Sequence, residues 1–451
     1  MEEKIRDIFR TGVTRSVEHR EKCLWRLRHE ILRLEPEILE ALHQDLGKPE
    51  FESRATETGF VVIEIDHVLD HLDRWTQSID GIAPLTAQPA TTRIIPSPKG
   101  TVLIISPWNY PFQLAMAPLI AAVAAGNTVV VKPSELAPTV ANVIKKIIDA
   151  TFPDGEVQCV LGGPEAAAEL LKKPFNHFFF TGSTRIGKIV AHAAAEQLAS
   201  STLELGGKSP CVIHPTADIA LSARRIAWGK ALNAGQTCVA PDYLLAHSKI
   251  HDALVDAIKS EWRNFYGNSP MNSRDYGRIV NHQHFDRLDQ ILKSTKGTVH
   301  GGRKDRLQKF IEPTMITGVD SDDSSMAEEI FGPILPVMTW NEESDLERII
   351  AQNPDPLAFY VFSGDQKFSE RLLNNYSFGG GCVNHAVHQV ACPDLPFGGI
   401  RASGVGQYHG KFGFDTFTHY KGILNAGTIF DVKLGYPPYN DRARLLTWLY
   451  R

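Results

Sequence analysis

The spacing of hydrophobic positions changes near Thr101. Before it, apolar residues recur every three or four positions among charged ones, as in Glu21–Leu34 and Phe60–Trp75, which predicts surface helices that cover a core. From Thr101 onward, β-branched runs such as TVLIIS and NTVVVKPS flank an apolar, Ala-rich stretch at Leu114–Ala125. This pattern predicts a strand, a buried helix and a second strand.

The alternation of strands and helices continues along the chain. Short apolar runs predict strands at Val157–Leu161, His177–Thr181 and Thr202–Leu205. Ala-rich stretches predict helices at Glu165–Leu171 and Ile186–Leu198. Alternating strands and helices imply a parallel sheet joined by right-handed crossovers.

A second α/β unit is predicted beyond Lys208. Strand-like PCVIH and YLLAH are each followed by a helical pattern, at Leu221–Asn233 and Lys249–Phe265. The hydrophilic stretches Ser294–Lys309 and Asp320–Ser325 predict exposed loops. A chain of 451 residues exceeds the usual size of one core, and it has no low-complexity linker. We therefore expect closely packed units with a ligand-binding cleft between them.

Composition excludes several classes of protein. Hydrophobic residues make up 43% and charged residues 22%, which is ordinary for a globular protein. A net charge of −5 argues against nucleic acid as a partner. The chain has no signal-peptide pattern and no apolar run of about 18 residues, and its last segment RARLLTWLYR is too short to span a bilayer, so we expect a cytoplasmic protein without an integral membrane segment. The six cysteines form no CxxC pair, which predicts free thiols and no metal site.

Few residues or short motifs of this chain indicate a function by themselves. The usual Gly-rich nucleotide fingerprint is missing after the strand at Thr101. In FTGSTRIGK a strand ends at Gly182 and a helix begins near Arg185, which suits either a pyrophosphate site or an ordinary helix cap. Cys238 in NAGQTCVAPDY occupies a tight turn that suits a nucleophile, whereas Glu204 after an apolar strand is either salt-bridged or functional.

Several segments taken together are far more specific than any one of them. SPWNYP, KPSE, FTGST, LELGGKSP, GQTC, EEIFGP and LPFGG occur in this order between about Thr101 and Gly422. In these motifs and in the interval between Glu204 and Cys238, the chain resembles the aldehyde dehydrogenase superfamily. NAGQTCVAPDYLL, and YHGKFGFDTFTHYKG followed by YPPY, are similar to the class 3 branch, which includes coniferyl, benzaldehyde and fatty aldehyde enzymes.

The resemblance implies an α/β fold of the aldehyde dehydrogenase type. We expect a Rossmann-type NAD-binding domain at 1–83 and 99–207 and a second α/β catalytic domain at 208–393. The segments 84–98 and 394–430 would bridge them and form a small β oligomerisation arm, and 431–451 would be a C-terminal tail. The same resemblance implies a homodimer, in which 91–98 and 410–421 lie between subunits.

The resemblance also implies a mechanism and its residues. Cys238 would be the nucleophile, Asn109 an oxyanion donor and Glu204 the base that activates water, so that an aldehyde is oxidised through a thioester. Lys208 would be structural. Glu135 would favour NAD by repelling a 2′-phosphate, with NADP as the alternative cofactor. The residues expected to bind the cofactor are Ser106, Pro107, Trp108, Lys132, Ser134, Glu135, Gly182, Ser183, Thr184, Arg185, Ile186, Gly187, Leu205, Glu329 and Phe331.

Other functions compete with this one. A CoA-acylating dehydrogenase would pass the thioester to a thiol, but such relatives typically lack the glutamate found here as Glu204. A non-catalytic binding or structural protein on the same fold would have no reason to keep Asn109, Glu204 and Cys238 together. The identity of the aldehyde is not encoded in these motifs, and aromatic or medium-to-long aliphatic aldehydes are the expectation.

Overall fold

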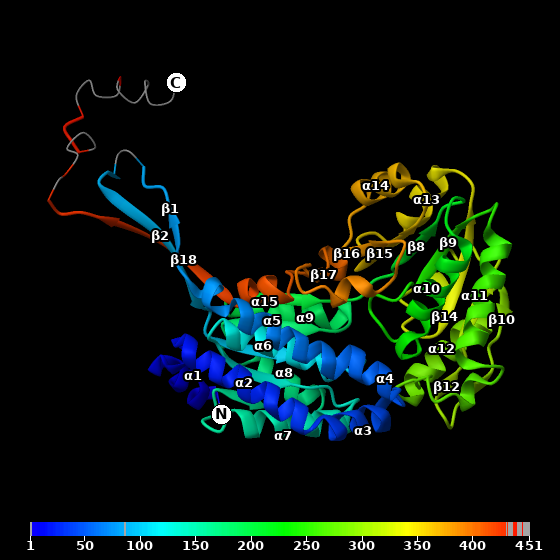
Figure 1. Ribbon diagram of the computed structural model, residues 1–451, viewed down its shortest axis with the longest axis horizontal. Coiled ribbons are helices and arrows are strands. Elements are labelled where there is room, and N and C mark those ends of the chain that lie inside the picture. Colours follow the sequence, from blue (N-terminus) through cyan, green and yellow to red (C-terminus); the bar gives the residue numbers. More distant parts are fainter. Residues whose placement is uncertain (1, 85–86, 430, 432–435, 440–443, 445–451) are drawn as a thin grey trace.

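The computed structural model describes residues 2–84, 87–429, 431, 436–439 and 444 of the chain. Figure 1 shows two α/β parts side by side, and a β arm that projects away from the N-terminal part. Most of the predicted tail, including Leu445, Leu446, Trp448 and Leu449, lies outside the described residues. No described helix has the length and hydrophobicity needed to cross a bilayer.

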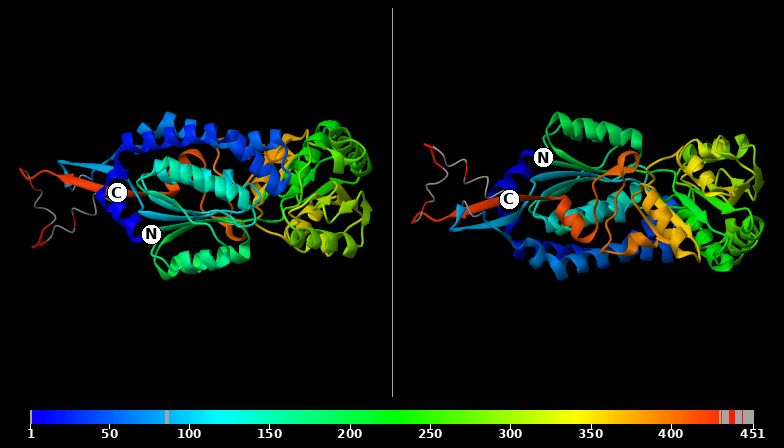
Figure 2. Two further views of the ribbon diagram at one scale, coloured as in Figure 1. Left: turned by 90° about the horizontal axis from the view of Figure 1, so that it is seen from below. Right: turned by 90° about the horizontal axis from the view of Figure 1, so that it is seen from above.

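The N-terminal part is built on a sheet of six strands in the order β17-β7-β6-β3-β4-β5. Neighbouring strands are parallel except β17, which runs antiparallel to β7. Helices cover both faces (Figure 2), so β3, β4 and β6 are buried along their whole length and read as continuous apolar runs. The strands are β3 (Thr101–Ile105), β4 (Thr128–Lys132), β5 (Val157–Cys159), β6 (His177–Thr181), β7 (Ser200–Glu204) and β17 (Gly404–Val405). The helices are α1 (Glu2–Thr11), α2 (Val17–Arg33), α3 (Glu35–Leu46), α4 (Glu50–Ser53), α5 (Gly59–Thr76), α6 (Gln113–Ala124), α7 (Pro138–Thr151), α8 (Pro164–Leu171), α9 (Thr184–Glu196) and α15 (Gly410–Thr416).

The second part is built on a sheet of seven strands in the order β10-β13-β14-β9-β8-β15-β16. Only its edge strand β10 is antiparallel to its neighbour. The strands are β8 (Pro210–Ile213), β9 (Tyr243–His247), β10 (Thr298–His300), β13 (Thr314–Thr317), β14 (Ile334–Trp340), β15 (Ala358–Phe362) and β16 (Gly380–Val383), and β11 (Lys304–Asp305) pairs separately with β12 (Phe310–Ile311). The helices are α10 (Ile219–Ala231), α11 (His251–Tyr266), α12 (His282–Ser294), α13 (Glu343–Ile350) and α14 (Gln366–Asn375).

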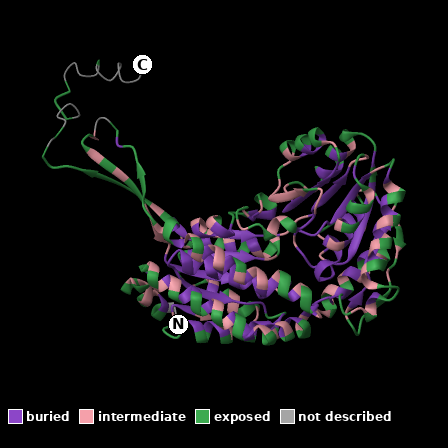
Figure 3. Cartoon of the chain, in the orientation of Figure 1, coloured by how far each residue is buried: buried purple, intermediate pink, exposed green. Residues whose placement is uncertain are grey.

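The arm is a three-stranded antiparallel sheet in the order β1-β2-β18. It is made of β1 (Ile79–Gly81), β2 (Ala90–Pro98) and β18 (Thr418–Ala426). The burial colours of Figure 3 show that the arm is largely exposed, in contrast to the two buried sheets. Segments far apart in sequence therefore form one surface available to another molecule.

The predicted parallel sheet and the second α/β unit are confirmed. The prediction of exposed loops was partly wrong. Residues 294–309 are exposed or half-buried, as expected, but they are not a loop throughout. They contain β10, which pairs with β13, and β11. In the stretch Asp320–Ser325, Asp323 is buried because its carboxylate accepts hydrogen bonds from Thr295, Lys296 and Ser325, which replace water. Hydrophilic composition alone does not reveal such internal partners.

Candidate active site

Four parallel strands of the first sheet end at one edge and bring separate motifs together. Ile105, which ends β3, is in register with Lys132 at the end of β4, and Thr181 of β6 is in register with Glu204 of β7. Ser106 and Gly182 directly follow β3 and β6, so they lie at the same edge. The carboxyl edge of an open parallel sheet is where nucleotides bind.

Helix α9 begins at this edge, and its first amides have no side-chain cap from the N-cap residue. Its N-cap residue Ser183 makes no capping hydrogen bond, whereas the preceding Gly182 donates its N–H to the carbonyl of Glu204. Thr184 instead donates its hydroxyl to the carbonyl of Ala402. An uncapped helix N-terminus suits a pyrophosphate.

The other α9 residues that are expected to bind the cofactor, and Leu205 after β7, differ in how far they are buried and in what they contact. Arg185 is exposed and Ile186 half-buried in the first turn. Gly187 packs against Leu205, because a Cβ at Gly187 would lie 2.6 Å from Cδ2 of Leu205. These two residues set how closely α9 approaches β7.

The KPSE segment forms a compact turn after β4. The ammonium of the buried Lys132 lies 2.6 Å from the carboxylate of Glu135. Burial would raise the pKa of Glu135, but the hydrogen bond from Lys132 brings it below the usual value, so the carboxylate is ionised. Ser134 accepts a hydrogen bond from the N–H of Leu136, so its hydroxyl shapes the turn.

A strained turn precedes Cys238. Helix α10 ends at Ala231, two residues before the predicted end, and Asn233, Ala234 and Gly235 adopt positive φ angles of 51°, 52° and 73°. Gly235 is required there because a Cβ would lie 2.2 Å from the carbonyl oxygen of Gly332.

The side chain of Gln236 holds this turn in place. Its amide nitrogen donates to the carbonyls of Asn233 and Arg278, and its oxygen accepts the N–H of Val280. Strained backbone that is fixed from several sides is typical of functional sites.

The thiol of Cys238 lies in an unusually acidic and enclosed environment. Burial raises its pKa far above the ordinary value, and the carboxyl groups of Glu329 and Glu204 raise it further. The backbone N–H groups of Cys238 and Val239 are directed at the sulfur and oppose this effect. The thiol is therefore protonated at rest, with backbone donors converging on it.

Asn109 reaches the same turn from the first sheet. It is buried, and its side-chain amide donates to the carbonyl of Gln236 at 3.0 Å. The backbone carbonyl of Asn109 accepts hydrogen bonds from the side chains of Asn233 at 2.7 Å and of Lys48 at 3.3 Å. An amide nitrogen carries two hydrogens, so one remains for an oxygen beside Cys238.

Glu204 is buried at the end of β7, and neither of its carboxylate oxygens has a hydrogen-bond partner among the described residues. Burial raises its pKa well above the ordinary value of a carboxylic acid. A buried carboxyl group without partners is costly to the fold, and such groups are concentrated at functional sites.

The EEIFGP segment closes the cofactor side of the site. Glu329 has its pKa raised to about 8 by burial and by Asp242, while the N–H of Gly207 holds its carboxylate. Phe331 adopts φ 51°, and its ring packs edge-on against Trp108 at 5.3 Å. Lys208 bonds to Asp242 and to the carbonyls of Ser325 and Glu328, which agrees with the structural role expected for it.

An apolar cavity of about 220 Å³ leads to Cys238. The sequence patterns did not single out most of its walls, because they come from elements that are distant in sequence. Its lining includes Phe60, Tyr110, Leu114, Trp228, Leu232, Val239, Val387, His388, Phe397, Tyr408 and His409.

The thiol of Cys238 has the buried Glu204 and the half-buried Glu329 beside it, and it lines an apolar cavity. Such an arrangement suits a dehydrogenase that acts through a cysteine adduct. The chain matches the aldehyde dehydrogenase family over residues 4–423, and it belongs to that family.

Comparisons with individual proteins agree on the family and its class 3 branch. The chain is 45% identical to 4,4'-diaponeurosporen-aldehyde dehydrogenase of Staphylococcus aureus, over 98% of this chain and 97% of that protein. It is 42% identical to aldehyde dehydrogenase family 3 member H1 of Arabidopsis thaliana, covering 98% and 93%. It is 40% identical to an enzyme of Rattus norvegicus described as aldehyde dehydrogenase, dimeric NADP-preferring, with 96% of each covered. The fold matches the substrate-bound state of Staphylococcus aureus AldH with a TM-score of 0.97 at 44% identity, over 99% and 98% of the two chains.

The chain is therefore an NAD(P)-dependent oxidoreductase that oxidises aldehydes. Its fold is the aldehyde dehydrogenase fold, as expected from the motifs. The competing CoA-acylating and non-catalytic functions are not favoured by these relatives.

Proposed function

We propose that the aldehyde is oxidised through a thioester on Cys238. Its sulfur bonds to the aldehyde carbon while the thiol proton leaves to solvent, and the carbonyl oxygen accepts hydrogen bonds from the amide of Asn109 and the N–H of Cys238. The thioester forms when that carbon loses a hydride, for which a nicotinamide cofactor held at the edge of the first sheet would supply the acceptor. Glu204 then takes a proton from water, whose oxygen attacks the acyl carbon and releases the acid and the thiol.

The observation that carries this proposal is the convergence on one sulfur. Glu204 and Glu329 both act on the pKa of Cys238, and Asn109 donates to the residue two positions before it. The test is NADH formation from an aldehyde with and without CoA. Turnover that is independent of CoA supports hydrolysis, whereas NADH that appears only with CoA would replace it by acylation of a thiol.

The residues at the sheet edge fit a dinucleotide. The hydroxyls of Ser106 and Thr181 are buried without partners among the described residues, and the first amides of α9 have no side-chain cap from the N-cap residue. We assign the KPSE turn to the adenosine ribose, the start of α9 to the pyrophosphate, and Glu329 with Phe331 to the nicotinamide riboside. Ser106, Pro107 and Trp108, which follow β3 at the same edge, are assigned to the cofactor as well. When bound, the cofactor supplies the hydride acceptor. The ionised Glu135 favours NAD, because a 2′-phosphate would meet like charge; equal kcat/KM for NADP would remove that assignment.

The cavity supports an apolar aldehyde as substrate. Its walls are largely aliphatic and aromatic, and the Staphylococcus aureus relative is named for 4,4'-diaponeurosporen-aldehyde. We propose that the substrates are aromatic or medium-to-long aliphatic aldehydes. The test is to compare kcat/KM over a series of aldehydes of increasing chain length. A preference for acetaldehyde over all longer members would contradict it.

We also propose a cytoplasmic homodimer formed through the arm. Ile94, Ile423 and Leu424 are exposed on paired strands, and the rat relative is described as dimeric. All six cysteines are free, which suits a reducing compartment. Light scattering of the whole protein should give twice the mass of one chain, and Ile423→Lys should lower the measured mass. A monomer in the wild-type protein would contradict the dimer. Cell fractionation tests the compartment.

A further inference from the structure

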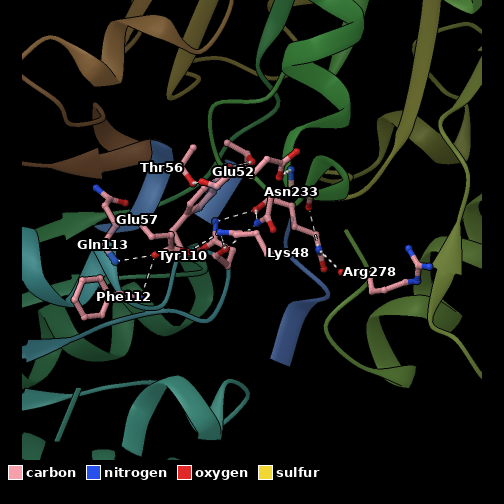
Figure 4. A network of polar contacts seen from close by, with 12 residues as sticks. Lys48, Glu52, Thr56, Glu57, Tyr110, Phe112, Gln113, Asn233 and Arg278 are labelled. Atoms are coloured by element: carbon pink, nitrogen blue, oxygen red, sulfur yellow. Dashed lines mark hydrogen bonds and ion pairs between the residues drawn. The ribbon is translucent and has the colours of Figure 1, made fainter. Parts of the chain in front are cut away.

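A fully buried ion pair lies beneath the loop that carries Asn109. Nζ of Lys48 is 2.5 Å from Oε1 of Glu57, and both side chains have 0% exposure. Figure 4 shows the pair between the N-terminal helices and the loop. Neither residue belongs to a motif singled out in the sequence.

The side chains of Lys48 and Glu57 hydrogen-bond to the loop before and after its turn. Lys48 donates to the carbonyl of Asn109 at 3.3 Å and lies 3.9 Å from the centre of the Tyr110 ring. The second oxygen of Glu57 accepts the N–H groups of Phe112 at 3.1 Å and Gln113 at 2.8 Å, at the start of α6. Among the described residues, the backbone groups that hydrogen-bond to these two side chains therefore belong to Asn109, Phe112 and Gln113, which lie in the loop and at the start of α6.

A buried ion pair is weak support for stability, because desolvation of both charges offsets their attraction. Its better-attested use is to specify one geometry. Asn109 has a short side chain. The position of its backbone carbonyl therefore largely determines where its side-chain amide points. Displacement by about 1 Å is enough to weaken an oxyanion donor severely.

We propose that the Lys48–Glu57 pair positions Asn109 as the oxyanion donor, and thereby sets the rate of thioester formation without touching the substrate. This inference rests on the proposed function, in which Asn109 contacts the oxyanion. Lys48 and Glu57 are positioning residues, and their effect should vanish when the amide of Asn109 is absent.

The experiment measures the NADH burst by rapid mixing of the whole enzyme. Lys48→Met should slow the burst by about tenfold or more, with the KM for aldehyde changed by less than about threefold, because donor placement acts in the transition state. Asn109→Ala should slow it by roughly 10²–10³. In the Asn109→Ala background, Lys48→Met should cost less than about threefold further, because the two residues act as one unit.

The outcomes separate the two claims. An Asn109→Ala burst within about threefold of wild type would overturn the proposed function at that residue. If Asn109→Ala slows the burst strongly, but Lys48→Met slows the burst of the double variant as much as it slows that of wild type, the positioning role alone would be overturned. Arg20→Met is the matched control, because Arg20 is a buried cation whose hydrogen-bond partners in the described part of the chain are the carbonyls of Thr14, Arg15 and Ala124. Its burst should match wild type. Equal slowing in Arg20→Met would show a general loss of stability and overturn the proposal. If Lys48→Met does not fold, Glu57→Gln applies the same comparison.

Discussion

The carboxyl group of Glu329 occupies the space that a side chain at position 206 would need, so Gly206 lies directly beside it. A Cβ at Gly206 would lie 2.0 Å from Oε2 of Glu329, while the next N–H, that of Gly207, holds the same carboxylate. The strand end that carries Glu204 is thus joined to the segment that carries Glu329. Glycine is needed at 206 because a carboxylate occupies the space of its side chain.

Gly206→Ala should displace Glu329 and weaken cofactor binding. Loss of a typical hydrogen bond costs about 0.5–1.5 kcal/mol, so the Kd for NAD should rise by about two- to tenfold. Binding is measured by fluorescence titration of the folded variant. Gly380→Ala is the control, since no atom lies within 4 Å of its added Cβ. An unchanged Kd in Gly206→Ala would separate Glu329 from the cofactor.

Cys238→Ser should abolish turnover while NAD still binds, because a hydroxyl without a dedicated base is a far poorer nucleophile than a thiol. Steady-state NADH formation and NAD titration are the measurements. Cys392→Ser, at an exposed cysteine, should keep wild-type rates. Normal activity of Cys238→Ser would require another nucleophile.

Part of this site could be predicted from the sequence because strand ends are local features. Ser106, Lys132, Gly182 and Glu204 each follow an apolar run, and parallel strands place such ends at one edge. The motif resemblance added roles that spacing does not supply. Asn109 alone would have been an ordinary turn residue.

The rest depends on contacts between distant segments. Lys48 lies in the short connection between α3 and α4, and Glu57 lies in the helical segment before α5. In this charged N-terminal region a charged pair usually means an exposed surface, yet both side chains are buried against the Asn109 loop. Trp228, Phe397 and Tyr408 meet in one cavity wall only after the chain has folded. The positive φ of Phe331, a non-glycine residue, also has no local signature.

Activity should rise with pH through the range in which Glu204 ionises. Burial raises the pKa of Glu204, so its acid form persists to higher pH than for an ordinary carboxyl group, and the acid form cannot take a proton from water. The kcat should therefore increase with pH above the range in which an ordinary carboxyl group ionises, when hydrolysis limits turnover. A separate burst rate at each pH distinguishes hydrolysis from ionisation of Cys238, whose raised pKa acts in the same direction. A flat profile of both rates would contradict the assignment.

Glu204→Gln gives the sharpest separation of the two half-reactions. The amide keeps the size of the carboxyl group but cannot accept a proton from water, so addition of the thiol and hydride transfer should proceed while hydrolysis stops. Mixing the variant with aldehyde and NAD should give a burst of NADH that approaches one equivalent per site, followed by little turnover. Intact mass should then show the acyl group on Cys238.

The alternative role for Glu204 is activation of the thiol, and the same experiment decides between them. If Glu204 removes the proton of Cys238, the burst should slow together with the steady state, and no acyl-enzyme should accumulate. Glu64→Gln is the matched control, because Glu64 is another buried carboxyl group, which accepts the N–H of Gly410 at 2.8 Å. It should retain turnover within about threefold, since it has no part in proton transfer at Cys238. A missing burst in folded, NAD-binding Glu204→Gln, beside a normal Glu64→Gln, would assign Glu204 to thiol activation instead of water activation.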